Sequence, residues 1–381
     1  MRAWAILMML QGHFIDGLLD MVFRDPDNMV FSVWKYFRGI TAPVFFTVSG
    51  FIFTYLLIRV PERGFENPRI RKGVKRGLQL LFIGYLLRLN LFGLFQGVLY
   101  DSFFFVDVLH CIGLAILAII GVYLLTYRYQ KFLFPAALLG ITLLLFLFEP
   151  IYKQWSFGLM PDSLANYFTR ANGSVFTIIP WMGYSAFGAF VSVLFTRYKN
   201  YQHLYATSIP LSAISGLALI FYSSGFFVAL YQWTGLQLFA DIYFNNYLFI
   251  RLGDVLVVFA LFMIFREFLK NRTLLRIGQN TLSIYVIHFI ILYGSFTGMG
   301  LYRYFHHSLS PGIAISGAIA FMIVCSYLAL KYDTHEVKIK SALYKVPGIA
   351  GLGGGPWYLL AQKHLKNSFS RLLRAVGLEK S

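Results

Sequence analysis

Ionisable side chains interrupt several long apolar stretches of this sequence, and most of them stand in pairs three residues apart. The pairs are His13 with Asp16, Asp107 with His110, and Arg251 with Asp254. At that spacing both members of a pair lie on one helix face, where a carboxylate can hold an imidazole or a guanidinium. A neutral imidazole held in this way can take a proton from an attacking hydroxyl or amine. The pattern therefore predicts acid and base chemistry inside apolar helices. The catalytic candidates are His13, Asp16, Asp107, His110 and His288.

Two arginines in the same stretches, Arg88 and Arg251, suit an anionic ligand such as a phosphate-bearing or thioester-bearing cofactor. Each could equally neutralise a neighbouring carboxylate, and both interpretations stay open. A charge within a bilayer costs about 2.5–3.5 kcal/mol on insertion scales, so each of these residues needs a reason. The alternatives to a catalytic site are a set of buried structural pairs and the ion-coupling site of a transporter. One shared polar cavity would account for all of them.

The apolar stretches predict an all-α, polytopic integral membrane protein of about ten transmembrane helices. The chain of 381 residues is 58% hydrophobic and only 13% charged, which is more apolar surface than one soluble core can bury. No two-residue alternation of the kind found in β-barrel strands is present. The predicted spans are residues 3–23, 41–59, 77–99, 103–125, 132–149, 174–196, 205–230, 246–266, 276–297 and 311–331.

The Lys and Arg residues behind the net charge of +17 lie mainly in every second loop. This distribution indicates how the protein is oriented in the membrane and does not indicate nucleic-acid binding. The loop 59–76 is the most basic one, and its side of the membrane should be the cytoplasm, with both chain termini on that side. The same loop could receive the phosphates of an anionic cofactor, although orientation alone predicts these charges. Cys111 and Cys325 have no disulfide or zinc-ligand spacing, so no metal site is expected.

Two domains are predicted: a membrane domain over residues 1–335 and a basic cytoplasmic tail over residues 336–381. Within the tail, residues 357–376 space apolar side chains three or four apart with Lys and Arg between them. This pattern is typical of an amphipathic helix lying on a membrane surface. The long loop 149–174 is expected to cap a site from the other side. The sequence leaves open whether the chain forms a homo-oligomer.

Five stretches together resemble a known family. They are RAWAILMMLQGHFID (2–16), FRGITAPVFFTVSGFIF (37–53), DVLHCIGLAIL (107–117), IPWMGYSAFGAF (179–190) and IGQNTLSIYVIHFIILY (277–293). In order and spacing they resemble the bacterial branch of the heparan-alpha-glucosaminide N-acetyltransferase catalytic-domain family, within a wider superfamily of transmembrane acyltransferases. The likeness covers roughly residues 2–295, and it is specific as a combination.

The resemblance implies transfer of an acetyl or other acyl group from cytoplasmic acyl-CoA to an acceptor, often a sugar, on the far side of the bacterial inner membrane. The family's catalytic role is assigned to a histidine of the first helix, and His13 occupies that place. His13 would then be the general base or a transient acyl carrier, with Asp107, His110 and His288 lining the same site. The family usually has further residues ahead of the arginine that is Arg2 here, so Arg2 is left without a role.

Two other functions compete with this expectation. A membrane acyltransferase of the acyltransferase-three type would share His13 but acylate hydroxyl groups. A proton-coupled transporter or lipid flippase would use the same charges for ion coupling, although the sequence has no inverted repeat. The sequence therefore predicts an N- or O-acetyltransferase that uses acetyl-CoA or another acyl-CoA. Its acceptor would be an envelope glycan or a small molecule.

Overall fold

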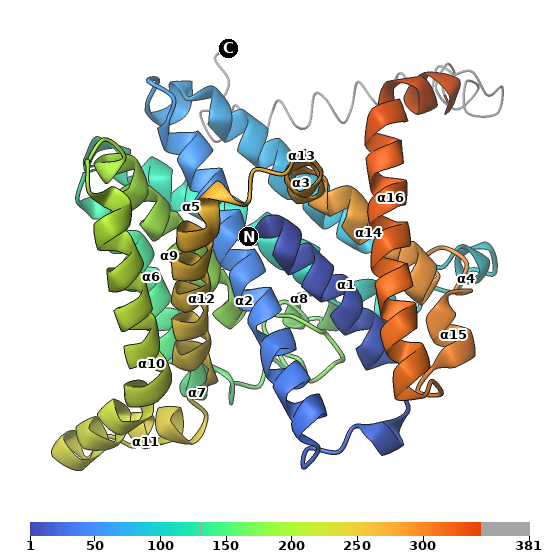
Figure 1. Ribbon diagram of the computed structural model, residues 1–381, viewed down its shortest axis with the longest axis horizontal. Helices are drawn as coiled ribbons and strands as arrows, with labels where there is room; N and C mark the ends of the chain where they lie inside the picture. Colours follow the sequence, from blue (N-terminus) through green and yellow to red (C-terminus); the bar gives the residue numbers. More distant parts are fainter. Residues whose placement is uncertain (130, 344–381) are drawn as a thin grey trace.

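The protein is all-helical in the computed structural model, which describes residues 1–129 and 131–343, with side chains described up to residue 335. Every predicted span corresponds to a helix or a helix pair (Figure 1). These are α1 (Arg2–Leu18), α2 (Met29–Ile58), α3 (Pro68–Arg88), α5 (Val108–Thr126), α6 (Leu133–Leu147), α9 (Ile178–Tyr198), α10 (Leu204–Thr234), α12 (Tyr247–Ile264), α13 (Arg272–Gln279) with α14 (Thr281–Tyr293), and α16 (Pro311–Leu343). The amphipathic helix predicted for residues 357–376 lies outside the described residues.

Five short helices join the long ones: α4 (Leu91–Phe95), α7 (Glu149–Tyr152), α8 (Asp162–Ala165), α11 (Gln237–Phe244) and α15 (Leu301–Phe305). The break before α4 is local in origin. The α3 helix ends at Arg88, and the Asn90 side chain then caps α4 by accepting a hydrogen bond from the Gly93 N–H at 3.1 Å. The span predicted over residues 77–99 is therefore not one continuous helix.

Six helices of the described chain are long and apolar enough to cross a bilayer, and the bent pair α13 and α14 makes seven if it is one span. The pair bends by 71°. Among the rest, α1 has 17 residues and α6 has 15, which correspond to about 26 and 22 Å against a hydrocarbon layer of about 30 Å. The α3 helix is long enough but has basic residues along its first half. Of the ten predicted crossings, six or seven therefore correspond to helices that are long and apolar enough to span a bilayer.

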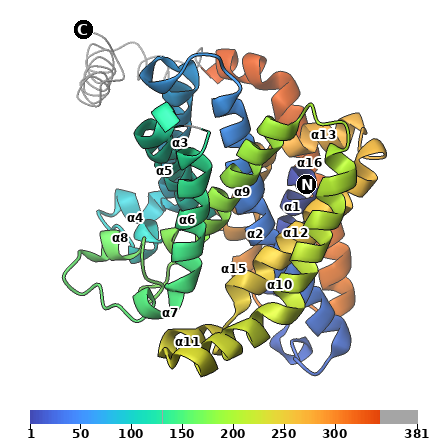
Figure 2. The same cartoon turned by 90° about the vertical axis from the view of Figure 1, so that its left-hand side faces the viewer.

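The basic loops gather at one end of the helix bundle. The end of α2, the start of α3 and the end of α16 all lie at the upper end in Figure 1. The connection between α9 and α10 reaches the same end (Figure 2). This arrangement is the one expected if all the basic connections share one side of a membrane.

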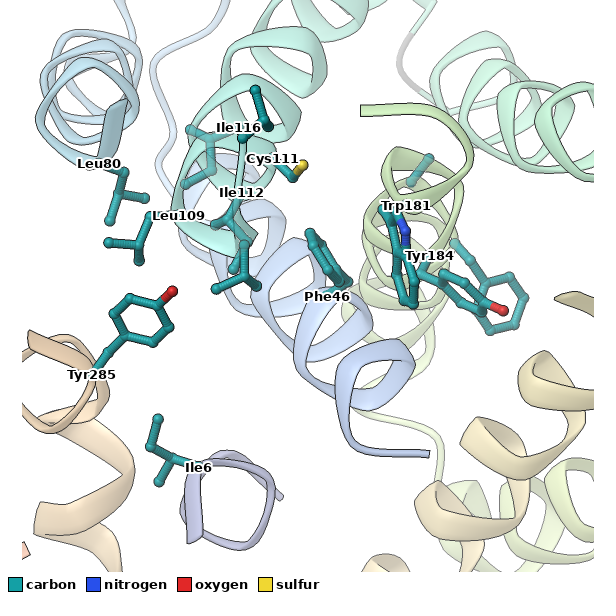
Figure 3. Close-up of a cluster of buried hydrophobic side chains, with 14 of the residues drawn as sticks. Ile6, Phe46, Leu80, Leu109, Cys111, Ile112, Ile116, Trp181, Tyr184 and Tyr285 are labelled. Atoms are coloured by element: carbon teal, nitrogen blue, oxygen red, sulfur yellow. The ribbon is translucent and has the colours of Figure 1, made fainter. Parts of the chain in front are cut away.

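The α2 and α9 helices form the centre of the bundle, with α3, α5 and α6 on one side and α10, α12 and α1 on the other (Figure 2). Phe46 of α2 stacks against Trp181 of α9, with ring centroids 5.3 Å apart, inside the apolar core drawn in Figure 3. Two glycines let the backbones touch. A Cβ on Gly50 would lie 1.9 Å from the Ser185 carbonyl oxygen, and one on Gly188 would lie 1.8 Å from that of Thr47. The small-residue stretch 41–50 therefore serves close helix packing.

Replacing Gly188 by alanine should separate α2 from α9, because the new methyl group meets backbone and not a movable side chain. We expect a loss of about 3 kcal/mol, the upper range for overpacking a core. Thermal unfolding in detergent, followed by size-exclusion chromatography, measures it. The matched control is Gly140→Ala on α6, where no atom lies within 4 Å of the added carbon. Equal unfolding temperatures for the two variants would contradict the packing argument.

Candidate active site

A cavity of about 830 Å³ lies between α1, the end of α3, the start of α5 and the segment from Tyr285 to Tyr302. Five of the residues predicted from the sequence line it: His13, Asp16, Arg88, Asp107 and His288. They come from helices that are far apart in the chain. The structure therefore brings most of the predicted polar residues to one cavity. The remaining two, His110 and Arg251, do not line the cavity.

The imidazole of His13 lies beside a tyrosine and a second imidazole. Its Nδ1 atom is 3.0 Å from the Tyr293 hydroxyl oxygen, and its ring centroid is 5.4 Å from that of His288. Because Nδ1 is engaged by the hydroxyl, Nε2 is the ring nitrogen left to exchange a proton with a ligand. The sequence predicted a carboxylate as the hydrogen-bond partner of His13. In the structure the partner is the Tyr293 hydroxyl.

His288 is completely buried, and neither of its ring nitrogens has a well-aligned hydrogen-bond partner among the described residues. Tyr285, one turn earlier on α14, packs edge-on against it with ring centroids 4.8 Å apart. A buried polar group without a partner is costly. A ligand or water molecule in the cavity would satisfy this imidazole, so its chemistry fits a site that binds a polar substrate.

Asp107 caps the first turn of α5 and holds a small network. One carboxylate oxygen accepts a hydrogen bond from the Leu109 N–H at 3.0 Å and lies 2.9 Å from His110 Nδ1. The other oxygen lies 3.5 Å from Nε of Arg88. A helix N-terminus also favours negative charge. The predicted pairing of Asp107 with His110 is therefore present, together with an arginine from a different helix.

The two partners of Asp107 have different positions. His110 is fully buried behind the carboxylate, against Gly84 of α3, where a Cβ would come within 2.5 Å of the imidazole. It contacts Asp107 and lines neither this cavity nor another one found among the described residues. Arg88 lines the cavity, and its guanidinium carbon lies 5.8 and 5.9 Å from the ring centroids of Phe105 and Phe289. A guanidinium held between two rings is well placed to bind an anionic or carbonyl group.

Asp16 forms an ion pair with Arg38 of α2, and no hydrogen bond joins it to His13 among the described residues. The structure therefore pairs Asp16 with Arg38, and of the two carboxylates predicted to orient an imidazole, Asp107 is the one that contacts a histidine, His110. Arg38 lines the cavity together with Asp16. Arg2, which had no predicted role, donates a hydrogen bond to the Thr281 hydroxyl at the start of α14.

Arg251 belongs to a separate cluster between α12 and α2. Its Nη1 donates to Asp254 at 2.9 Å and to the Tyr36 carbonyl oxygen at 3.2 Å. The Tyr36 hydroxyl in turn donates to Asp254 at 2.7 Å. Of the two interpretations left open by the sequence, the geometry favours neutralisation of a neighbouring carboxylate over ligand binding. The prediction that Arg251 binds a cofactor finds no support in its position.

Sequence reasoning did not select Arg38 and Tyr293 for the site. Arg38 was placed in a loop because the apolar window begins at residue 41, whereas α2 begins at Met29. The signal for that start was Asn28, which accepts a hydrogen bond from the Phe31 N–H at 3.1 Å. Tyr293 stands five residues after His288, off the same helix face, and only the three-dimensional arrangement reveals its contact with His13.

A protein-family model described as an acyltransferase domain, acyltransferase 3, matches residues 1–331 and thus most of the chain. Neither a curated protein nor a solved structure matches it. The match confirms that the chain is a transmembrane acyltransferase, and its type is acyltransferase-three, the first of the two competing functions considered above. It does not specifically support the heparan-alpha-glucosaminide N-acetyltransferase branch. With membrane-spanning helices around a polar cavity, the chain is a membrane acyltransferase that belongs to the acyltransferase 3 family.

Proposed function

We propose that this acyltransferase moves an acetyl or other short acyl group from acyl-CoA to a hydroxyl or amine of an envelope glycan, with His13 as the general base. The observation that carries the proposal is the cavity in which His13, His288, Arg88 and Asp107 meet. The transporter alternative has no comparable support, since the family match covers the whole helical core.

In the proposed reaction His13 Nε2 takes the proton of the acceptor hydroxyl or amine as that atom bonds to the acyl carbon. The thioester C–S bond breaks, and the protonated imidazole returns the proton to the sulfur, so that CoA leaves as its thiol. Tyr293 fixes the orientation of the ring through Nδ1. The products are the acylated acceptor and CoA. A transient acyl group on His13 is the alternative course.

The other cavity residues have supporting roles in this proposal. Arg88 stabilises negative charge near the reacting atoms, and Asp107 fixes Arg88 from behind, while Arg38 stays paired with Asp16. His288 lines the same cavity and binds a polar group of the acceptor. Tyr100, Tyr302 and Asn90 at the cavity wall supply the mixture of aromatic faces and hydrogen-bonding groups that suits a sugar. Both an amine acceptor, as in the heparan-alpha-glucosaminide N-acetyltransferase resemblance, and a hydroxyl acceptor are consistent with one base.

The topology that serves this function has ten crossings, with both termini and the basic loops in the cytoplasm of a bacterial cell. The short helices α1 and α6 and the basic helix α3 then complete the bundle, beside the six or seven longer spans. Acyl-CoA approaches from the basic end, and the acceptor approaches from the opposite side. The membrane domain occupies residues 1–335, and the remaining residues form the cytoplasmic tail.

His13→Ala should lower acyl transfer by about a thousandfold, because a positioned general base contributes about 10²–10⁴ in rate. The measurement is transfer of label from radioactive acetyl-CoA to envelope material by purified protein in proteoliposomes. His203→Ala is the matched control, since His203 precedes α10 at the basic end, outside the cavity, and its side chain makes no capping hydrogen bond. Full activity of His13→Ala would remove this residue from the chemistry. If the protein transports a solute or lipid but releases no CoA when the acceptor is added, the proposal that it is an enzyme is wrong.

Tyr293→Phe should lower kcat about tenfold while leaving KM for acetyl-CoA unchanged. The variant keeps the ring but loses the hydroxyl that lies 3.0 Å from His13. Its pH–rate profile should also shift, because the hydroxyl no longer biases the protonation of the imidazole, whereas a purely structural residue would leave that profile unchanged. Tyr304→Phe, at a largely exposed position, is the control. An unaltered kcat and pH profile for Tyr293→Phe would show that this contact has no role in catalysis.

A further inference from the structure

A second, smaller cavity of about 350 Å³ lies between α1, α2 and α9. It has His13 and Arg38 in common with the larger cavity, so His13 stands between the two spaces. The wall of the smaller cavity is mainly apolar, with Met8, Ala42 and Phe45 contributing to it. A group held here would reach the same imidazole as a group held in the larger cavity.

Two buried donors in the wall of this smaller cavity have no partner among the described residues: the Thr41 hydroxyl and the Trp181 indole N–H. Both side chains are more than nine-tenths buried, at 6% and 8% exposure. Two comparable groups on α2 do have partners. Thr47 on the same helix donates to the Pro43 carbonyl at 2.8 Å, and Trp34 donates to Gln11 at 2.8 Å.

The local sequence explains why this part of α2 is polar. Pro43 has no N–H to donate to the Gly39 carbonyl four residues earlier, so the helix lacks one backbone hydrogen bond beside the cavity. Leaving two donors buried and unpartnered costs free energy unless something in the cavity accepts from them. An acceptor oxygen is therefore the chemical feature that this space selects.

We propose that the smaller cavity is the acyl subsite, in which the thioester carbonyl oxygen of the donor accepts hydrogen bonds from Thr41 and Trp181. This inference rests on the proposed function and names the residues that would bind the transferred group. The apolar wall suits the methyl group of an acetyl or another short chain. Arg38 also lines the space, but it is already paired with Asp16, and Arg170 comes from an exposed loop position. Thr41 and Trp181 are therefore the buried donors in this wall that have no partner among the described residues.

The arrangement also stabilises the reaction. As the acceptor atom bonds to the acyl carbon, the carbonyl electron pair moves onto oxygen, where Thr41 and Trp181 would hold the developing charge. The pair returns as the C–S bond breaks, and the sulfur receives the proton carried by His13. Donors aimed at such an oxygen typically contribute about 10²–10³ in rate each.

Thr41→Val and Trp181→Phe test the subsite, because each removes the donor. The first nearly conserves the side-chain volume, whereas the second also replaces the indole by a smaller ring. We expect kcat to fall about a hundredfold in each variant. The unfolding temperature should stay unchanged in Thr41→Val and fall in Trp181→Phe, because the smaller ring leaves part of the core unfilled. Thr54→Val is the matched control for the first, since Thr54 lies on the same helix with a buried, unpartnered hydroxyl outside both cavities. Trp34→Phe is the control for the second, because its indole donor lies outside the subsite.

The acyl-chain profile gives a second readout on the same protein. Ala42→Leu should fill part of the cavity and lower the ratio of butyryl-CoA to acetyl-CoA turnover about tenfold. If wild-type protein transfers acetyl groups but all three variants keep its kcat and chain-length profile, the subsite is wrong, the proposed function stands, and water satisfies the two donors. If wild-type protein transfers no acyl group, the proposed function fails, and this inference fails with it.

Discussion

A carboxylate in a bilayer must find positive charge or hydrogen-bond donors, and the way Asp107 does so organises this protein's site. Its oxygens meet a helix N-terminus, an imidazole behind them and a guanidinium from α3. This network fixes the start of α5 against the end of α3, beside the cavity. Arg88 can face a ligand because Asp107 holds it and two aromatic rings flank it.

The site depends equally on where helices come close. The α2 and α9 backbones touch through Gly50 and Gly188, which sets the distance between Thr41 on one helix and Trp181 on the other. Because Pro43 has no N–H, the Gly39 carbonyl lacks its helical hydrogen bond, and the Thr41 hydroxyl has no partner among the described residues. Both polar groups belong to residues that line the smaller cavity together with His13. Packing and chemistry are therefore linked. The same small-residue stretch that joins the two helices also forms the wall of the smaller cavity.

Much of this architecture was predictable, because apolar stretches of spanning length and pairs of ionisable residues are properties of the sequence itself. Each predicted span contains a helix, and five of the predicted residues line one cavity. The number of membrane crossings was harder to predict, because counting apolar stretches of spanning length does not reveal where a helix breaks. It could not show that α3 ends at Arg88 or that α13 and α14 meet at a bend of 71°. The sequence also did not reveal which charged residues pair across helices. Spacing of three residues correctly paired Asp107 with His110 and Arg251 with Asp254, but Asp16 pairs across helices with Arg38.

The most direct measurement is an experimental structure of the full chain in lipid nanodiscs with a non-transferable acyl-CoA analogue bound. The account predicts that the analogue's carbonyl oxygen lies within hydrogen-bonding distance of Thr41 and Trp181, and that its acyl carbon faces His13 at the boundary of the two cavities. A structure in which His13 and His288 are separated by packed apolar side chains, with the analogue bound elsewhere, would contradict it.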